Sequence, residues 1–445
     1  MKCTVYDEDR AYVFRSWSAQ KRVDPVVVEG GSGAWFWDNQ GIKYLDFCSQ
    51  RVNLNLGHQH PRLISRIKDQ AGKLATLSQI HASAAKSEAA RLIAERTPGD
   101  LDKIFFTNSG TEAVEHAIRM AKIHTGRNKV LTMYRSYHGS TAGAMSYTGE
   151  PRRWAIEPGV PGAIKFIGPY LYRSSFSSNT ESEESARALA HLEEIVNFEG
   201  PQNVAAIMIE SIVGTNGILV PPDGYLQGIR DLCNKHQIVM ICDEVMSGFG
   251  RCGEWFAVNK WQVVPDLITF AKGVNSGYVP LGGVAVSPEI YRSFEELSFP
   301  GGGTYFGHPL ACATAAESIH IFEDEQIIER VRRLGDEIIG PGLLNLYEKH
   351  PSIGEVRGTG CFWALELVKS RKSREMLVPF NAKGQQAAPM KELKDALMKQ
   401  GLWVLTHHNR LHICPPLITD EADIELGLEI IDKSLTVVDQ HVEQG

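Results

Sequence analysis

Short apolar runs alternate with helical patterns through the middle of the chain. The runs are unbroken and rich in β-branched residues, as in strands that are buried on both faces of a sheet. They lie at residues 104–106, 130–133, 204–209, 238–242, 267–270 and 283–286. After the first run, Val114, Ala117, Ile118 and Ala121 share one face of a helix that Gly126 would end. This alternation predicts an α/β domain whose mainly parallel sheet carries helices on both faces.

The two ends of the chain have a different pattern of apolar and polar residues. Residues 26–37 are followed by the turn sequence Asp38-Asn39-Gln40-Gly41, which predicts an antiparallel hairpin. Near the other end, residues 354–367 and 411–414 are strand candidates that lie among helical patterns. We therefore expect the two ends to build a second, smaller α+β domain together.

These patterns predict a division of the chain into three segments. Residues 1–55 and 326–445 would form the smaller domain, and residues 56–325 the large one. Residues 173–184 are polar and Ser-rich, which predicts an exposed loop, and residues 370–390 form another long irregular stretch. Long loops in compact enzymes often border a site.

Composition and charge narrow the class of protein. The 445 residues are 43% hydrophobic and 22% charged, and the formal net charge is −7, so we expect no nucleic acid and no membrane as a partner. A DNA-binding regulator would need a basic face that neither end supplies. No apolar run reaches eighteen residues, the start is unlike a signal peptide, and the eight cysteines include no C-x-x-C pair. A cytoplasmic protein with reduced thiols is predicted.

Polar residues follow four of the predicted strands at their carboxyl ends. They are residues 108–111, Glu210, Asp243 and Lys272. Because ligands of open α/β sheets bind outside the carboxyl ends of the strands, these side chains are expected to meet in one site. A P-loop is excluded because the chain has no G-x-x-x-x-G-K-[ST]. The glycines at residues 248–253 match G-x-G-x-x-G, but no strand leads directly into them, so a dinucleotide site is rejected.

Lys272 directly follows a buried strand, where an ordinary solvated lysine would be out of place. Such a lysine either snorkels from the sheet edge or is functional. Loss of water favours the neutral amine that a Schiff base requires. Ser109-Gly110-Thr111 is either an ordinary helix cap or a phosphate cradle, and Asp243 would keep a pyridine nitrogen protonated. Together these groups suit pyridoxal 5'-phosphate (PLP).

The sequence resembles the class III aminotransferases of PLP fold type I over nearly its whole length. The motifs that carry the resemblance are Asn108-Ser109-Gly110-Thr111-Glu112-Ala113, Tyr137-His138-Gly139, Asp243-Glu244-Val245, Gly248-Phe249-Gly250-Arg251 and Ala271-Lys272-Gly273. Glu210, Asp243 and Lys272 also keep the family's order and approximate spacing.

The resemblance implies a role for each cofactor residue. Lys272 would form the Schiff base and carry a proton, and Asp243 would pair with the pyridine nitrogen. Thr304 would reach the phosphate site of a neighbouring subunit, which implies a homodimer; without the family it would be an ordinary turn residue. The remaining cofactor-binding residues would be Ser109, Gly110, Thr111, Tyr137, His138, Glu210 and Val245.

The candidate substrate-binding residues are inferred from positions that differ from the family's pattern as well as from positions that match it. Thr215 and His412 stand where 4-aminobutyrate and ornithine enzymes place a glutamate and an arginine, so the Glu–Arg switch of those enzymes is missing here. Arg410, on the same strand face as His412, is the nearest substitute for gripping an oxo acid. Arg51 would bind a distal carboxylate or sulfonate, or else form an interdomain salt bridge. Trp17 would roof the pocket or be a core residue.

These residues together are most similar to the taurine and β-alanine type of ω-aminotransferase. We therefore predict ping-pong transfer of an amino group from an ω-amino acid, an ω-amino sulfonate or another primary amine to pyruvate or 2-oxoglutarate. An aminomutase or lyase on the same scaffold is the alternative, and a PLP-binding regulator is disfavoured by the charge. No metal is expected, because His58, His60, His407 and His408 lack further ligands at a defined spacing.

Overall fold

The computed structural model describes residues 4–443. Within them, a central sheet has the strand order β4-β10-β9-β8-β7-β5-β6. Its strands are β4 (Lys103–Thr107), β5 (Lys129–Met133), β6 (Ala163–Phe166), β7 (Val204–Glu210), β8 (Val239–Asp243), β9 (Leu267–Phe270) and β10 (Gly282–Val286). Strand β10 runs antiparallel to both of its neighbours, and the pairs from β9 to β6 are parallel. The predicted mainly parallel sheet is confirmed.

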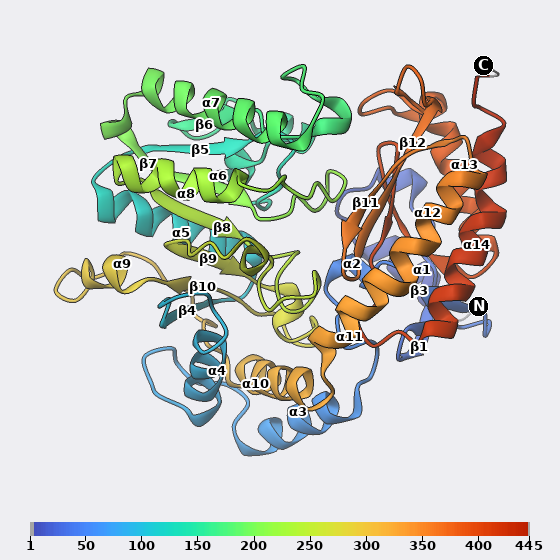
Figure 1. Ribbon diagram of the computed structural model, residues 1–445. Helices are drawn as coiled ribbons and strands as arrows, with labels where there is room; N and C mark the ends of the chain where they lie inside the picture. The colour runs from blue at the N-terminus through green and yellow to red at the C-terminus, as the bar shows by residue number, and fades with distance from the viewer. Residues whose placement is uncertain (1–3, 444–445) are drawn as a thin grey trace.

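Helices cover both faces of this sheet, as the unbroken apolar runs predicted (Figure 1). Every residue of β7 is buried, and its side chains alternate between two cores. Ile207 and Ile209 belong to the core that also contains residues of α7 (Glu181–Glu199) and α8 (Tyr225–His236). Ala206 and Met208 belong to the core with residues of α5 (Gly110–Thr125). Strands buried in this way position their carboxyl ends rigidly.

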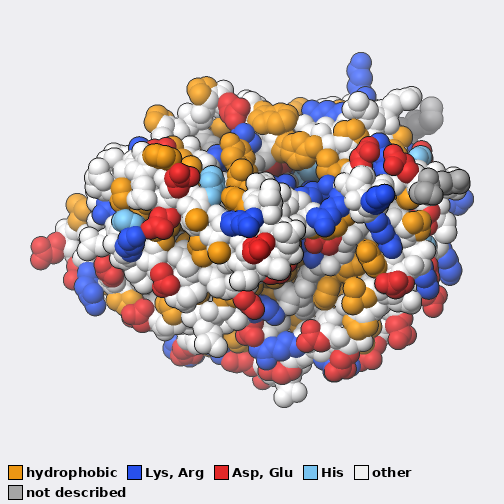
Figure 2. Space-filling view, turned by 45° about the horizontal axis from the view of Figure 1, so that its top comes forward, with side chains coloured by type: hydrophobic (Ala, Val, Ile, Leu, Met, Phe, Trp, Pro, Cys, Tyr) orange, Lys and Arg blue, Asp and Glu red, His pale blue; other side chains and the backbone are white. Residues whose placement is uncertain are grey.

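The other helices up to residue 324 pack around this sheet or lie in the N-terminal part. They are α1 (Val5–Tyr12), α2 (Ser49–Val52), α3 (Pro61–Lys73), α4 (Ala84–Ala94), α6 (Ala142–Tyr147), α9 (Pro288–Arg292) and α10 (Pro309–Asp324). None of the helices among residues 4–443 has the length and apolar composition needed to cross a bilayer. Acidic and basic side chains are interspersed over the face shown in Figure 2, as suits a modest net charge.

The two ends of the chain share one small sheet. It joins β1 (Val28–Ser32), β2 (Trp35–Asp38) and β3 (Lys43–Asp46) to β14 (Leu402–Trp403). The predicted hairpin is present as the antiparallel pair β2–β3. Strand β14 pairs parallel with β3, with Leu402 opposite Leu45, so a segment near residue 400 completes a sheet begun near residue 28.

A second sheet of the C-terminal part carries the residues that face the central sheet. It contains β11 (Ile353–Thr359), β12 (Phe362–Ser370), β13 (Glu375–Met376), β15 (Leu405–His407) and β16 (Arg410–Ile413). Helices α11 (Ile327–Arg333), α12 (Gly340–Lys349), α13 (Ala388–Lys399) and α14 (Glu421–Asp439) contribute to the same core, and α12–α14 lie along its outer side (Figure 1). The domain boundaries at residues 55/56 and 325/326 stay a prediction.

The prediction of an exposed loop over residues 173–184 is wrong at its end. Thr180 caps α7, so Glu181–Glu184 form the first turn of a helix. Acidic residues suit this position because they face the positive end of the helix dipole. Glu184 is fully buried, where it accepts a hydrogen bond from the backbone N–H of Tyr170 at 2.8 Å. A polar composition was therefore misread as an exposed loop.

Arg251 connects the glycine-rich turn at residues 248–253 by hydrogen bonds to the N-terminal and C-terminal parts of the chain. Its guanidinium is fully buried and donates to Asn55 Oδ1 at 2.7 Å and to the carbonyl oxygen of Cys361 at 3.1 Å. The motif that resembled a dinucleotide loop thus packs as a structural turn. The cysteines that the structure describes are buried and unbonded.

Candidate active site

A cavity of about 250 Å³ opens at the carboxyl ends of the central strands. Most of the predicted cofactor residues lie on its wall, although they come from five separate segments of the chain. It is lined by Ser109, Gly110, Thr111, Tyr137, His138, Gly139, Ser140, Glu210, Asp243, Val245, Met246, Ala271 and Lys272. The convergence expected from the strand ends is therefore seen in the structure.

Asp243, the last residue of β8, is held by several donors. Its Oδ2 lies 2.7 Å from His138 Nδ1, and its Oδ1 accepts hydrogen bonds from Val245 N–H and Thr269 Oγ1, each at 3.1 Å. Both Asp243 and His138 are buried. A carboxylate fixed in this way keeps its orientation toward a cationic ring nitrogen in the cavity.

Glu210 ends β7 beside Asp243, its partner in the β-ladder. Burial raises the pKa of its carboxyl to about 7, and the neighbouring negative charge of Asp243 adds to the shift. Its two oxygens accept hydrogen bonds from the backbone N–H groups of Tyr137 and Gly214, both at 2.8 Å. Glu210 thus fixes the segment that carries the Tyr137 ring.

Lys272 directly follows Ala271, and both residues line the cavity. Burial lowers the pKa of its ammonium to about 8, against the opposing attraction of Asp243 and Glu210. Its backbone has φ +45°, a conformation that costs energy for a side-chain-bearing residue and occurs at functional sites. A large fraction of this amine is therefore unprotonated near pH 8, as a nucleophile requires.

The start of α5 provides a cradle for an anion. Ser109 caps this 16-residue helix by accepting a hydrogen bond from Glu112 N–H at 3.4 Å. At Gly110 a Cβ atom would lie 2.8 Å from the Val245 methyl groups, so only glycine fits at this wall. Thr111 Oγ1 lies 3.0 Å from the N–H of Ser140. Hydroxyls and N–H groups at a helix N-terminus suit a phosphate.

Beside the cavity, an arginine that no motif indicated covers Tyr137. The Arg152 guanidinium lies 3.8 Å from the centroid of the Tyr137 ring and 4.9 Å from that of Trp17. Trp17 is 53% exposed and meets Tyr137 edge-on at 6.3 Å. Glu150, which is buried, binds Arg152 Nε and holds it in place. Trp17 therefore contacts a residue of the cavity wall, and its role as a roof over the pocket stays a prediction.

The other candidate substrate residues have different surroundings. Arg51 is exposed, lies in the kinked segment α2, and its charge lowers the pKa of Lys272. Within residues 4–443 no salt bridge to Arg51 is found, so the alternative of an interdomain ion pair has no support there. Arg410 and His412 are buried on β16, and Arg410 Nε donates to Glu366 Oε2 at 3.2 Å. Neither lines the cavity, and the same is true of Arg51, Arg152 and Trp17.

Thr304 is exposed and does not line the cavity of its own chain in the described structure. Among the same residues, Glu150, His407 and His408 bring potential metal ligand atoms within 4.8 Å of one another. Glu150 already holds Arg152, and the positive charges of Arg152 and Arg410 act on both histidines. A cation is disfavoured there, and the expectation of no metal stays a prediction.

The residues present fit PLP. Lys272 would supply the amine, Asp243 would pair with the ring nitrogen, Tyr137 and Val245 would form flat and apolar walls, and the start of α5 would hold the phosphate. This fold and site define a PLP-dependent enzyme of fold type I.

Comparison with known proteins narrows the class further. Residues 17–435 match the family described as aminotransferase class-III. Taurine–pyruvate aminotransferase of Bilophila wadsworthia is 31% identical over 446 residues, which is 97% of each chain. The 5-aminovalerate aminotransferase of Pseudomonas aeruginosa is 35% identical over 423 residues, 92% of this chain and 93% of the other.

A solved structure shows the same architecture. Taurine:2-oxoglutarate aminotransferase from Bifidobacterium kashiwanohense, in complex with PLP and glutamate, is 39% identical with a TM-score of 0.94, and 98% of each chain is covered. The protein belongs to the class III aminotransferases, and it is an ω-aminotransferase that uses PLP. The predicted family, fold, enzyme class and cofactor are confirmed.

Proposed function

We propose that the amino donor is an ω-amino acid or an ω-amino sulfonate, and that the acceptor is pyruvate or 2-oxoglutarate. One observation carries this proposal: Arg152 lies over the ring of Tyr137, a residue of the cavity wall, and is held there by Glu150. The exposed Arg51 adds a second positive charge near Lys272. A guanidinium pairs well with a carboxylate or sulfonate through parallel hydrogen bonds. Relatives that act on taurine and 5-aminovalerate are consistent with such a donor.

PLP supplies an electron-withdrawing ring that stabilises negative charge at the carbon bearing the donor's amino group. The protein's own residues then divide the remaining work. Lys272 Nζ would accept the proton from that carbon and deliver it to the cofactor carbon that keeps the amino nitrogen, and with the oxo acid it would move a proton in the opposite direction. Its lowered pKa, about 8, suits both the acceptance and the release of a proton near pH 8. Asp243, which is oriented by His138, would keep the ring nitrogen protonated.

The anionic end of the substrate would bind at a different place from its amine, which reacts at the cofactor. Arg152 would bind the anionic end above Tyr137, and Trp17 would cover it from solvent. Arg410 is already engaged by Glu366, and both Arg410 and His412 are buried on β16. We therefore assign the oxo acid's carboxylate to the same arginines that bind the donor, and not to Arg410.

A homodimer completes the proposed site. Thr304 is exposed on its own chain, in a glycine-rich segment, and would contact the phosphate held by the neighbouring subunit's α5. The active sites would then lie at the subunit interface, and a separated subunit would be inactive.

The decisive experiment follows the two halves of the reaction separately. Holoenzyme is mixed with taurine, β-alanine, 5-aminovalerate or an uncharged primary amine, without an oxo acid, and the cofactor's absorption is recorded. A transaminase stops after one equivalent of carbonyl product and resumes when pyruvate or 2-oxoglutarate is added. Turnover with amine alone would instead identify a mutase or lyase. Preference for uncharged amines would refute the proposed donor class.

A further inference from the structure

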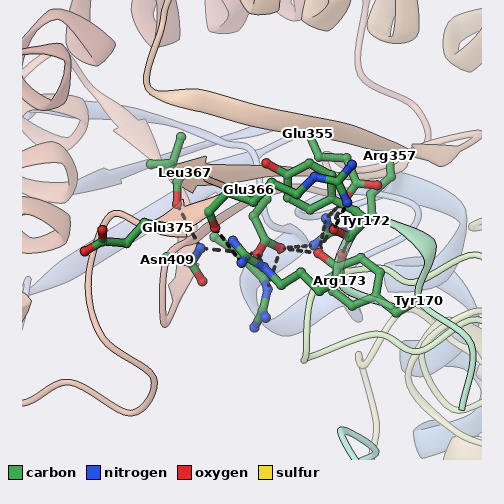
Figure 3. A network of polar contacts seen from close by, with 12 residues as sticks. Tyr170, Tyr172, Arg173, Glu355, Arg357, Glu366, Leu367, Glu375 and Asn409 are labelled. Atoms are coloured by element: carbon green, nitrogen blue, oxygen red, sulfur yellow. Dashed lines mark hydrogen bonds and ion pairs between the residues drawn. The ribbon is translucent and has the colours of Figure 1, made fainter. Parts of the chain in front are cut away.

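A second group of charges is buried where β12 and β16 face the central sheet (Figure 3). At its centre is Glu366 of β12, which is fully buried. Three arginines surround its carboxylate: Arg173 Nε at 2.5 Å, Arg357 Nη2 at 2.8 Å and Arg410 Nε at 3.2 Å. These cations hold the pKa of Glu366 well below its usual range.

The positive charges in this cluster outnumber the negative ones. Glu355 is the second carboxylate, and it binds Arg357, which already contacts Glu366. A fourth arginine, Arg135, stacks on the Tyr170 ring with its guanidinium 4.8 Å from the centroid. Burial lowers the pKa of Arg135, and the positive charges of Arg410 and Arg173 contribute. Four arginines thus face two carboxylates.

Arg135 has no ionic partner in the described residues. Its guanidinium makes no salt bridge there, and its Nη1 is buried without a hydrogen bond. Arg173 Nη2 is buried and unpartnered as well. Both side chains are partly exposed, but each has one buried N–H group that has lost water without gaining a partner, and such a cationic group favours a nearby counter-ion.

Arg135 and Arg173 share one small cavity. Arg135 and Arg173 line it together with Tyr170, and its volume is about 20 Å³. A space of this size suits one water-sized particle. It is distinct from the cavity that contains Lys272, whose wall includes none of these three residues.

We propose that a small monovalent anion, chloride in solution, binds between Arg135 and Arg173 beside the Tyr170 ring. Water would satisfy the hydrogen bonds but would leave the excess charge, whereas a halide offsets both. The anion would link the segment after β5 to the segment before α7, and through Arg173 to Glu366 of β12. This site does not depend on the donor proposed above.

The first test locates the ion in crystals of the holoenzyme. Crystals are soaked in sodium bromide, and anomalous scattering of bromide is measured. We expect a peak within contact distance of Arg135 Nη1 and Arg173 Nη2. Bromide peaks elsewhere but not there would overturn the proposal.

The second test uses the thermal unfolding of the holoenzyme at constant ionic strength, with chloride replacing gluconate. The Tm of the wild-type protein is expected to rise by about 2 °C when the chloride concentration is tenfold above the dissociation constant of the site, and the rise should become less steep at higher concentrations. Arg135→Gln should abolish this gain, and in gluconate its Tm should equal or exceed that of wild type because the unpaired charge is gone.

Two matched variants separate this site from other effects of salt. Arg91→Gln removes an exposed arginine that pairs with Glu95, and it should keep the chloride response. Arg152→Gln should also keep it, because Arg152 belongs to the donor pocket. A chloride response lost in Arg152→Gln but kept in Arg135→Gln would place the anion in the donor pocket and reject the proposed site.

Discussion

Lys272 is expected to destabilise the apoenzyme, and Lys272→Met should make it more stable. The ordinary lysine pKa is 10.5, and in the folded protein it is about 8 because of burial. The folded state thus binds its proton less tightly than the unfolded state, so its stability is reduced below pH 8 and recovers as pH rises toward 10.5. The shift corresponds to about 3 kcal/mol at pH 7 and about 1.4 kcal/mol at pH 9.5.

Methionine is a suitable replacement because it is unbranched and of similar length. It therefore tolerates the φ of +45° at residue 272 as well as lysine does. Urea denaturation of the PLP-free proteins at pH 7 and pH 9.5, in buffer without phosphate, gives the stability difference directly.

We expect Lys272→Met to exceed wild type by about 3 kcal/mol at pH 7 and by less than half of that at pH 9.5. Lys68→Met, at an exposed position on α3, should show no such dependence on pH. A variant less stable than wild type at pH 7, or a difference independent of pH, would refute the account of a desolvated amine.

Three further predictions concern the donor pocket, the buried carboxylate and the dimer. Arg152→Gln should raise the KM for taurine about 10- to 150-fold, the value of lost charge-assisted hydrogen bonds, and leave the KM for an uncharged amine unchanged in steady-state assays; an equal rise for both amines would contradict the assignment. Glu366→Gln should cost about 3–5 kcal/mol of stability at pH 7, because it leaves Arg173 and Arg410 without their counter-charge and Arg357 with Glu355 alone. Since the pKa of Glu366 is lowered, its stabilisation is complete above pH 4.5 and lost as pH falls below that, so melting curves of wild type and variant should converge in acid. Mixing Lys272→Ala subunits with Thr304→Ala subunits should restore activity at limiting PLP, because each mixed dimer contains one intact site; no recovery would show that Thr304 does not act across the interface.

The sequence was sufficient to predict the cofactor site because strand topology brings its residues together. Glu210, Asp243 and Lys272 each follow an apolar run, and parallel strands place such positions at one edge. Their partners could be inferred only by resemblance. The residue that binds Asp243, for example, is His138, which lies 105 positions away.

The donor pocket could not be predicted in the same way. Arg152 belongs to a short 3-10 segment, Pro151–Ile156, which follows no strand and matches no motif. Its position depends on Glu150 and on the ring of Tyr137, which are tertiary contacts. Strand alternation placed Arg410 on the same face as His412, but its carboxylate partner Glu366 depends on the register between β12 and β16.

The parallel pairing of β3 with β14 also constrains how the chain folds during synthesis. Strand β3 is complete after residue 46, yet its partner near residue 402 emerges from the ribosome some 350 residues later. During that interval the edge of β3 has no partner, while the central sheet can already assemble. A nascent chain released before α13 should therefore expose an unpaired strand edge and aggregate, whereas a full-length chain covers that edge in its last step.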